Sequence, residues 1–180
     1  MHVIQKGALS HRPGRGIMRI LQRFNEFLVA AGSWGTILFM AVIAVVIPYE
    51  VIGRYLFQKM TIWSGEVSTY SLVWASMLGG AAGLKKGYMI RLTSVLESVP
   101  PAVAGALKLT SYLCALFFFG AMFGYGLFQT LYNVKQTSPA IGLVMSFPYA
   151  ALPTGFFIMF FLTLEELLVF LGMGRKGEGR

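Results

Sequence analysis

The sequence contains no aspartate, one cysteine and two histidines among its 180 residues. A single cysteine excludes an internal disulfide and any zinc-finger spacing, and Cys114 lies in an apolar run where a small packing residue is expected. Both histidines, His2 and His11, precede the apolar stretches, so no histidine within a span can ligate haem. No carboxylates are paired in the pattern of a catalytic cleft, no serine has a histidine to activate it, and there is no phosphate-binding Gly-Lys loop. These absences predict a protein that is not an enzyme and has no catalytic, metal or cofactor site.

Charged residues are scarce as well. They make up 12% of the chain and hydrophobic residues 56%, whereas a soluble domain has roughly 25% charged residues. Too little polar surface remains to cover an apolar core, which predicts an integral membrane protein. Fifteen lysines and arginines against seven glutamates give a net charge of +8. Because these cations lie in short segments between apolar runs, they fit contact with lipid headgroups and not binding to nucleic acid.

Four uncharged stretches are long enough to cross a bilayer, which takes about 20 apolar residues per helix. They predict an all-α membrane protein with four transmembrane helices in one bundle, and no stretch alternates apolar and polar residues as a membrane β-strand would. The last helix is preceded by a loop, because Ser138-Pro139-Ala140 and Gly142 interrupt the apolar stretch, while Pro148 suits a first helical turn. The helices are expected at about 30–53, 64–84, 104–133 and 147–171.

Lysine and arginine predict the orientation, because cytoplasmic loops of membrane proteins carry an excess of these residues. With four spans both termini share one side, and twelve of the fifteen basic residues fall on that side. The opposite side keeps Arg54, Lys59 and Lys135. We therefore expect a multi-pass protein with cytoplasmic termini, in which one membrane domain at 17–172 lies between a flexible basic tail at 1–16 and a second basic tail at 173–180.

Apolar residues recur at helical spacing before the first span, at Ile17, Ile20, Leu21, Phe24 and Leu28. This pattern favours an amphipathic helix lying in the cytoplasmic interface or, equally, an extension of the first span. Residues 88–99 are expected to form a shorter interfacial helix that ends before Pro100-Pro101.

The ionisable residues of the spans lie at their ends, at Glu50 and Arg54, at Glu66, and at Glu165 and Glu166. A charge at the membrane centre is unfavourable by roughly 2.5–3.5 kcal/mol per residue. Glu50 and Arg54 are four residues apart, in the order that favours a helical ion pair. Glu66 opens the second span, where a carboxylate complements the helix dipole, and Trp63 suits the interfacial aromatic belt. Each residue has this local explanation or, as the alternative, a contact with a partner protein.

Two segments carry a resemblance to a known family. The first, Trp63-Ser64-Gly65-Glu66, opens the second span with a tryptophan and an acidic residue. The second and more specific segment is Gln136-Thr137-Ser138-Pro139-Ala140-Ile141-Gly142, which leads into Pro148-Tyr149. Together with the number and spacing of spans over roughly 20–170, the chain resembles the small, Q-type membrane subunit of tripartite ATP-independent periplasmic (TRAP) transporters. It departs from the family pattern at Gly65, where an acidic residue is common, and near a family histidine and aspartate, where it has Met89 and Thr93.

The resemblance implies a function. In such transporters a periplasmic binding protein captures an organic acid, and a large membrane subunit carries it across the membrane, typically with sodium, while the small subunit acts as a scaffold. It also implies the bacterial inner membrane as the location, and those two proteins and membrane lipids as partners. The substrate is not predicted, because the binding protein selects it. The candidate partner-contact residues are Glu50, Arg54, Trp63, Glu66, Gln136, Ser138 and Pro139.

Two other functions stay open on the residues alone. A small homodimeric exporter would need a carboxylate near the middle of the membrane, and Glu50 lies too close to the end of its span. A membrane anchor for an enzyme complex is disfavoured because no span contains a haem-ligating histidine. Short-looped spans without central charge or an evident inverted repeat suit a helper subunit better.

Overall fold

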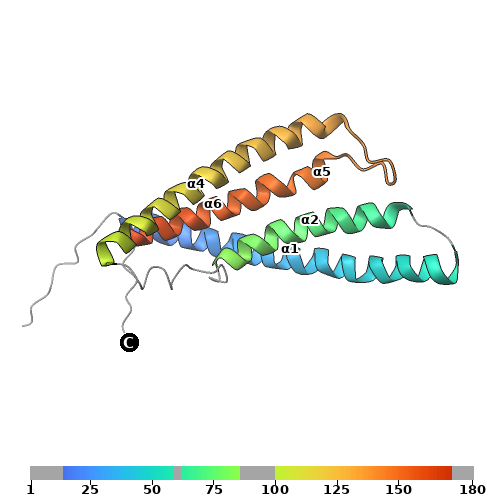
Figure 1. Ribbon diagram of the computed structural model, residues 1–180, viewed down its shortest axis with the longest axis horizontal. Helices are drawn as coiled ribbons and strands as arrows, with labels where there is room; N and C mark the ends of the chain where they lie inside the picture. The colour runs from blue at the N-terminus through green and yellow to red at the C-terminus, as the bar shows by residue number, and fades with distance from the viewer. Residues whose placement is uncertain (1–13, 59–61, 86–99, 172–180) are drawn as a thin grey trace, which may run out of the picture.

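The computed structural model describes residues 14–58, 62–85 and 100–171, which fold into helices joined by loops (Figure 1). The long helices are α1 (Gly14–Leu56), α2 (Ile62–Lys85), α4 (Pro101–Tyr132) and α6 (Ala151–Phe170), and the short ones are η1 (Asn133–Lys135) and α5 (Ser146–Tyr149). Within these residues the only β-type pairing is an isolated bridge between Thr137 and Val144. The prediction of an all-α bundle with four long helices is confirmed. The helix expected at 88–99 and most of the two predicted tails lie outside the described residues.

Three helical segments are long and apolar enough to cross a membrane: Ile20–Leu56 in α1, Val103–Lys135 in α4 and η1, and Ser146–Phe170 in α5 and α6. The helix α2 has 24 residues, and at 1.5 Å per residue it is about 36 Å long, more than the ~30 Å of a hydrocarbon core. It is rich in serine, alanine and glycine, small residues that let neighbouring helices approach closely. Its length therefore fits the fourth predicted crossing.

The long helices form two antiparallel pairs that meet along α2 and α6 (Figure 1). The helix α1 packs along α2, and α4 packs along α6. In addition α1 contacts α6 where Asn25 meets Phe161. Figure 1 places the start of α1 and the end of α6 toward one end of the bundle, and the connections from α1 to α2 and from α4 to α5 at the other. This arrangement leaves α2 and α6 as the central pair.

The core between α2 and α6 depends on close backbone approach. A Cβ built on Gly155 of α6 would lie 2.8 Å from the Cβ of Met77 on α2, a separation too short for any side chain larger than hydrogen. Glycine at this position therefore lets the two helices pack together. The buried cluster around this contact consists of Leu78, Ala81, Ile158, Met159 and Leu162.

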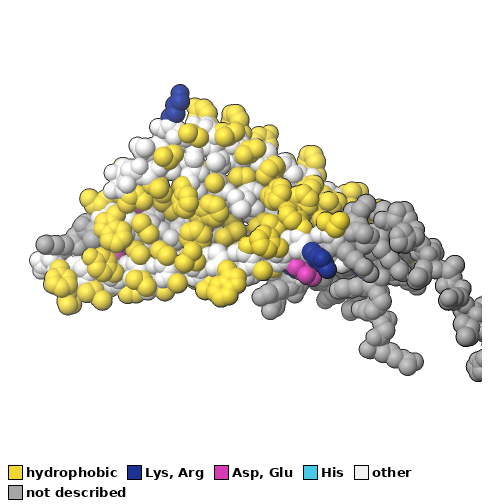
Figure 2. Space-filling view, turned by 180° about the vertical axis from the view of Figure 1, so that it is seen from behind, with side chains coloured by type: hydrophobic (Ala, Val, Ile, Leu, Met, Phe, Trp, Pro, Cys, Tyr) yellow, Lys and Arg dark blue, Asp and Glu magenta, His cyan; other side chains and the backbone are white. Residues whose placement is uncertain are grey.

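Large apolar side chains cover the outside of the bundle. Figure 2 shows them over most of the visible face, with charged side chains at only a few places. Soluble monomers rarely expose apolar patches of this extent, so the surface suits lipid or a membrane-embedded partner. On α1 and α4 the most exposed of these residues include Trp34, Val45, Phe117, Tyr125 and Phe128.

The helix α1 is continuous over 43 residues, so the region 17–30 extends the first span and forms no separate helix. At 1.5 Å per residue α1 is about 64 Å long, roughly twice the thickness of a hydrocarbon core. The apolar face expected from the sequence packs inward in part, because Leu28 lies against the buried core whereas Ile20 is 71% exposed. Asn25 is fully buried and donates hydrogen bonds to α6.

Candidate functional site

A carboxylate near the start of α2 holds the loop that joins α4 to α6. Glu66 Oε2 accepts a hydrogen bond from Ser138 Oγ, and Glu66 Oε1 accepts one from the Ala140 N–H at 3.2 Å. Ser138 is only 3% exposed, and its Oγ accepts a bond from the Ile141 N–H at 3.4 Å. The carboxylate thus supplies acceptors for polar groups that are turned away from water. This contact joins α2 to the loop that follows α4, although Glu66 and Ser138 are 72 positions apart in the sequence.

Two aromatic residues extend this contact along α2. Tyr70 and Trp74 follow Glu66 at intervals of four residues and so share one face of the helix. The Tyr70 hydroxyl donates to Met145 Sδ at 3.5 Å, and Trp74 Nε1–H donates to the Phe147 carbonyl at 3.2 Å. The rings of Trp74 and Phe147 also lie 5.5 Å apart between centroids. The segment 136–147 therefore has three successive anchors on α2.

Backbone hydrogen bonds give the 136–145 loop a defined shape. The Ser138 N–H donates to the Leu143 carbonyl at 2.8 Å, and the Met145 N–H donates to the Gln136 carbonyl at 2.8 Å. Gly142 has a φ of +67°, a left-handed conformation that glycine adopts without a steric penalty. The result is a hairpin-like turn that exposes Pro139 and Ile141 near its tip and Val144 at its base.

Two of the predicted contact residues, Glu66 and Ser138, are in direct contact, and Pro139 lies exposed directly after Ser138. Gln136 takes part through its backbone, while its side chain is exposed. The helix-dipole explanation of Glu66 is wrong, because α2 begins at Ile62 and has no acidic residue in its first turn, where the dipole acts. The carboxylate instead accepts hydrogen bonds from the loop.

The other predicted contact residues lie in local pairs near the end of α1. Arg54 Nη2 and Glu50 Oε1 are 2.8 Å apart, with side chains 50% and 23% exposed, respectively. The Trp63 ring lies 5.9 Å from that of Tyr49, which links the start of α2 to α1. A role of these residues in binding a partner stays a prediction.

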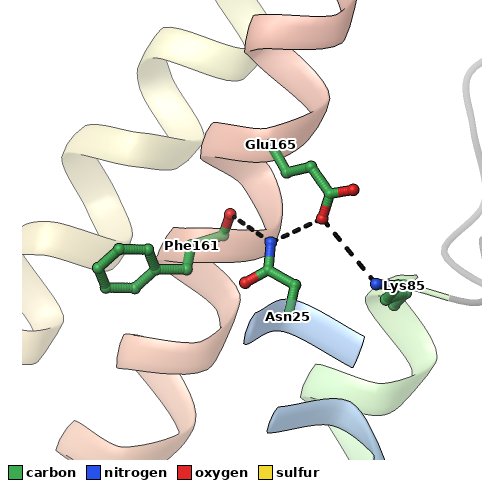
Figure 3. Close-up of polar contacts among 4 residues, drawn as sticks. All are labelled: Asn25, Lys85, Phe161 and Glu165. Carbon is green, nitrogen blue, oxygen red and sulfur yellow. Dashed lines mark hydrogen bonds and ion pairs between the residues drawn. The ribbon is translucent and has the colours of Figure 1, made fainter. Parts of the chain in front are cut away.

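A second polar cluster lies toward the opposite end of α2, where three helices meet (Figure 3). Asn25 of α1 is fully buried, and its Nδ2 donates to Glu165 Oε2 at 2.6 Å and to the Phe161 carbonyl at 3.1 Å, both on α6. Lys85 Nζ, at the end of α2, lies 3.9 Å from the same Glu165 oxygen. Because a carbonyl and a carboxylate only accept, Nδ2 must face them. Asn25 Oδ1 is then buried with no hydrogen-bond partner among the described residues.

The apolar periodicity of 17–30 does not single out Asn25, and Glu165 was expected to mark where the last helix leaves the hydrocarbon or, as the alternative, to contact a partner protein. A usable signal is nevertheless present. Met18, Asn25 and Gly32 are spaced by seven residues and so lie along one helical face. All three are buried. The small Gly32 therefore indicates which face of the helix is packed.

The two clusters are separated by about the thickness of a membrane. Glu66 and Lys85 are nineteen residues apart on α2, which corresponds to about 28 Å along the helix axis and is close to the ~30 Å of a hydrocarbon core. No charged residue lies between them on this helix. Both clusters therefore fit the two membrane–water boundaries, where they connect the α1–α2 pair to the α4–α6 pair.

Comparison with known proteins agrees with this picture. A family model described as "Tripartite ATP-independent periplasmic transporters, DctQ component" matches residues 43–171. The chain is 28% identical over 171 residues to the isethionate TRAP transporter permease protein DctMQ of Oleidesulfovibrio alaskensis, covering 89% of this chain and 25% of that relative. It thus spans a quarter of that relative's length. It is also 23% identical over 132 residues to the sialic acid TRAP transporter small permease protein SiaQ of Vibrio cholerae serotype O1, covering 73% of this chain and 76% of that relative.

Proposed function

Because the chain belongs to the DctQ family of tripartite ATP-independent periplasmic transporter components, we propose that it is the small membrane subunit of such a transporter. It scaffolds a large transport subunit, which takes up an organic acid on an ion gradient, typically of sodium. A periplasmic binding protein delivers the solute. The chain lies in the inner membrane of a bacterium with both termini in the cytoplasm, and it is not an enzyme.

The uncharged middle of the bundle is the observation that carries this proposal. A carrier that works alone needs polar or charged groups near the membrane midplane to bind its substrate and coupling ion. Here the uncharged stretch of α2 extends from Glu66 to Lys85, and the hydrogen-bonded charges gather near its two ends. A scaffold needs a rigid bundle instead, and the close packing of α2 on α6 supports that role.

The class of solute is supported by the names of two relatives. One is named for isethionate and the other for sialic acid, and both compounds are organic acids. We expect the binding protein to select the acid that is carried. Exchanging this chain for another small subunit should therefore leave substrate choice unchanged.

Reconstitution tests the proposal directly. The chain is expected to co-purify in mild detergent with the large subunit of its transporter. Proteoliposomes holding both subunits, supplied with binding protein and a sodium gradient, should take up the organic acid, and vesicles lacking either subunit should not. Sodium-driven uptake by this chain alone would overturn the proposal, and so would full activity of the large subunit in its absence.

A further inference from the structure

The 136–145 loop is held more tightly than a simple connection between two helices requires. It is closed by its own backbone hydrogen bonds, and Glu66 fastens it to α2 through Ser138 and Ala140. We propose that Glu66 is a positioning residue that keeps this loop in the shape to which the periplasmic binding protein docks. This inference rests on the proposed function, which supplies that partner and places the loop on the periplasmic side.

Glu66 is the strongest of the three anchors on α2. It accepts two hydrogen bonds from the loop, one from a side chain and one from the backbone. Hydrogen bonds to a carboxylate are roughly twice as strong as those between neutral groups. The Tyr70 hydroxyl bonds only to a sulfur, a weak acceptor, and Trp74 bonds beyond the loop at Phe147. Removing the Glu66 carboxylate therefore frees the loop tip while leaving its base attached.

The outer face of the loop fits an acidic protein surface. Ile141 and Val144 are 37% and 41% exposed, and Pro139 is exposed beside them. Lys135, directly before the loop, is exposed and forms no ion pair with another described residue. The Glu66 charge is turned inward, so the outer face is apolar with an available cation. Complementary charge steers and orients protein association. We therefore expect the docking surface of the partner to be apolar and bordered by carboxylates.

The location of the loop decides which partner can reach it. It connects α4 to α5 at the end of the bundle away from the start of α1 (Figure 1). When the termini are cytoplasmic, a soluble protein meets this loop from the periplasm. Binding to a loop that is already ordered avoids the loss of conformational entropy on docking. The Glu66 anchor thereby increases affinity without itself contacting the binding protein.

Transport kinetics with purified binding protein test this inference. The complex with the large subunit is reconstituted with Glu66→Ala, Glu66→Gln or Ser138→Ala, and uptake is measured against the concentration of solute-loaded binding protein. We expect Glu66→Ala to raise the half-saturating concentration about five- to tenfold and to leave the maximal rate within about twofold. Glu66→Gln, which retains one acceptor oxygen, should give a smaller increase. Glu26→Gln is the matched control, because Glu26 is an exposed carboxylate next to Asn25, far from the loop, and it should behave as wild type.

Hydrogen exchange and salt dependence supply independent measurements. Exchange across 136–145 should accelerate in Glu66→Ala and not in Glu26→Gln. Lys135→Gln should raise the half-saturating concentration and weaken its dependence on ionic strength. An unchanged half-saturating concentration despite faster loop exchange would overturn the inference. Loss of the large subunit from the Glu66→Ala complex would overturn it as well, because the loop would then serve that subunit. If the proposed function itself is wrong, uptake will not require the wild-type chain at all, and this result differs from every outcome that concerns the loop alone.

Discussion

Replacing Asn25 by aspartate probes the contact between α1 and α6 with almost no change in shape. The Asn25 amide donates to Glu165 at 2.6 Å and to the Phe161 carbonyl at 3.1 Å. An aspartate carboxylate has no proton to donate, so both acceptors would face another acceptor in a fully buried position. Asn25→Leu, which has the same branching but is larger, removes the same hydrogen bonds without adding a charge, and it also removes the unpartnered Oδ1. Comparison of the two variants separates lost hydrogen bonds from added repulsion.

The expected loss of stability follows from these contacts. Two buried hydrogen bonds contribute about 1 kcal/mol each, and within membranes such bonds average about 0.6 kcal/mol. Two carboxylates about 4 Å apart repel by about 4 kcal/mol at an effective dielectric constant of 20. Lys85, 3.9 Å from Glu165, offsets part of that repulsion. We expect Asn25→Asp to lower the free energy of unfolding by about 3–5 kcal/mol and Asn25→Leu by about 1 kcal/mol.

Unfolding in detergent micelles, followed by circular dichroism as denaturant is added, measures these differences. A double variant, Asn25→Asp with Glu165→Gln, restores one donor facing one acceptor and removes the like charge. It should recover more than half of the stability lost in Asn25→Asp. If Asn25→Asp is no less stable than Asn25→Leu, or if the two changes of the double variant are merely additive, the reasoning about this cluster is refuted.

Three further changes test other parts of the structure. Gly155→Ala places a methyl group 2.8 Å from Met77 Cβ, so the free energy of unfolding, measured from a melting curve, should fall by about 1–3 kcal/mol. Gly124→Ala, where the added methyl group would have no heavy atom within 4 Å, should leave that free energy nearly unchanged. Glu50→Gln should change unfolding free energy by less than about 1 kcal/mol, because the pair with Arg54 is partly exposed. Exposed Cys114 of α4 should react in vesicles with an apolar maleimide and resist a charged, membrane-impermeant one, since it lies in an apolar span; equal labelling by both reagents would contradict that placement.

The helices could be predicted from the sequence because uncharged stretches of about 20 residues have few alternatives to a membrane helix. The ion pair of Glu50 with Arg54 was also predictable, since its partners are one helical turn apart. The anchoring of Ser138 by Glu66 was not, although both residues stood among the candidates, because they are 72 positions apart in the chain. The same applies to Asn25, whose partner Glu165 is 140 positions away. Periodicity shows that a face is apolar, but it does not show which other helix covers it.

The placement of polar and small residues follows from the cost of charge in a membrane. A carboxylate at the midplane is unfavourable by several kcal/mol, whereas near the boundary its remaining acceptor sites can still reach water. Charged hydrogen bonds can therefore fasten helices together only near the two ends, as Glu66 and Glu165 do. In between, the helices must be held by close contact of small residues, such as Gly155 against Met77. Along α2 no charged side chain lies between Glu66 and Lys85, and this arrangement suits the proposed role as a rigid scaffold.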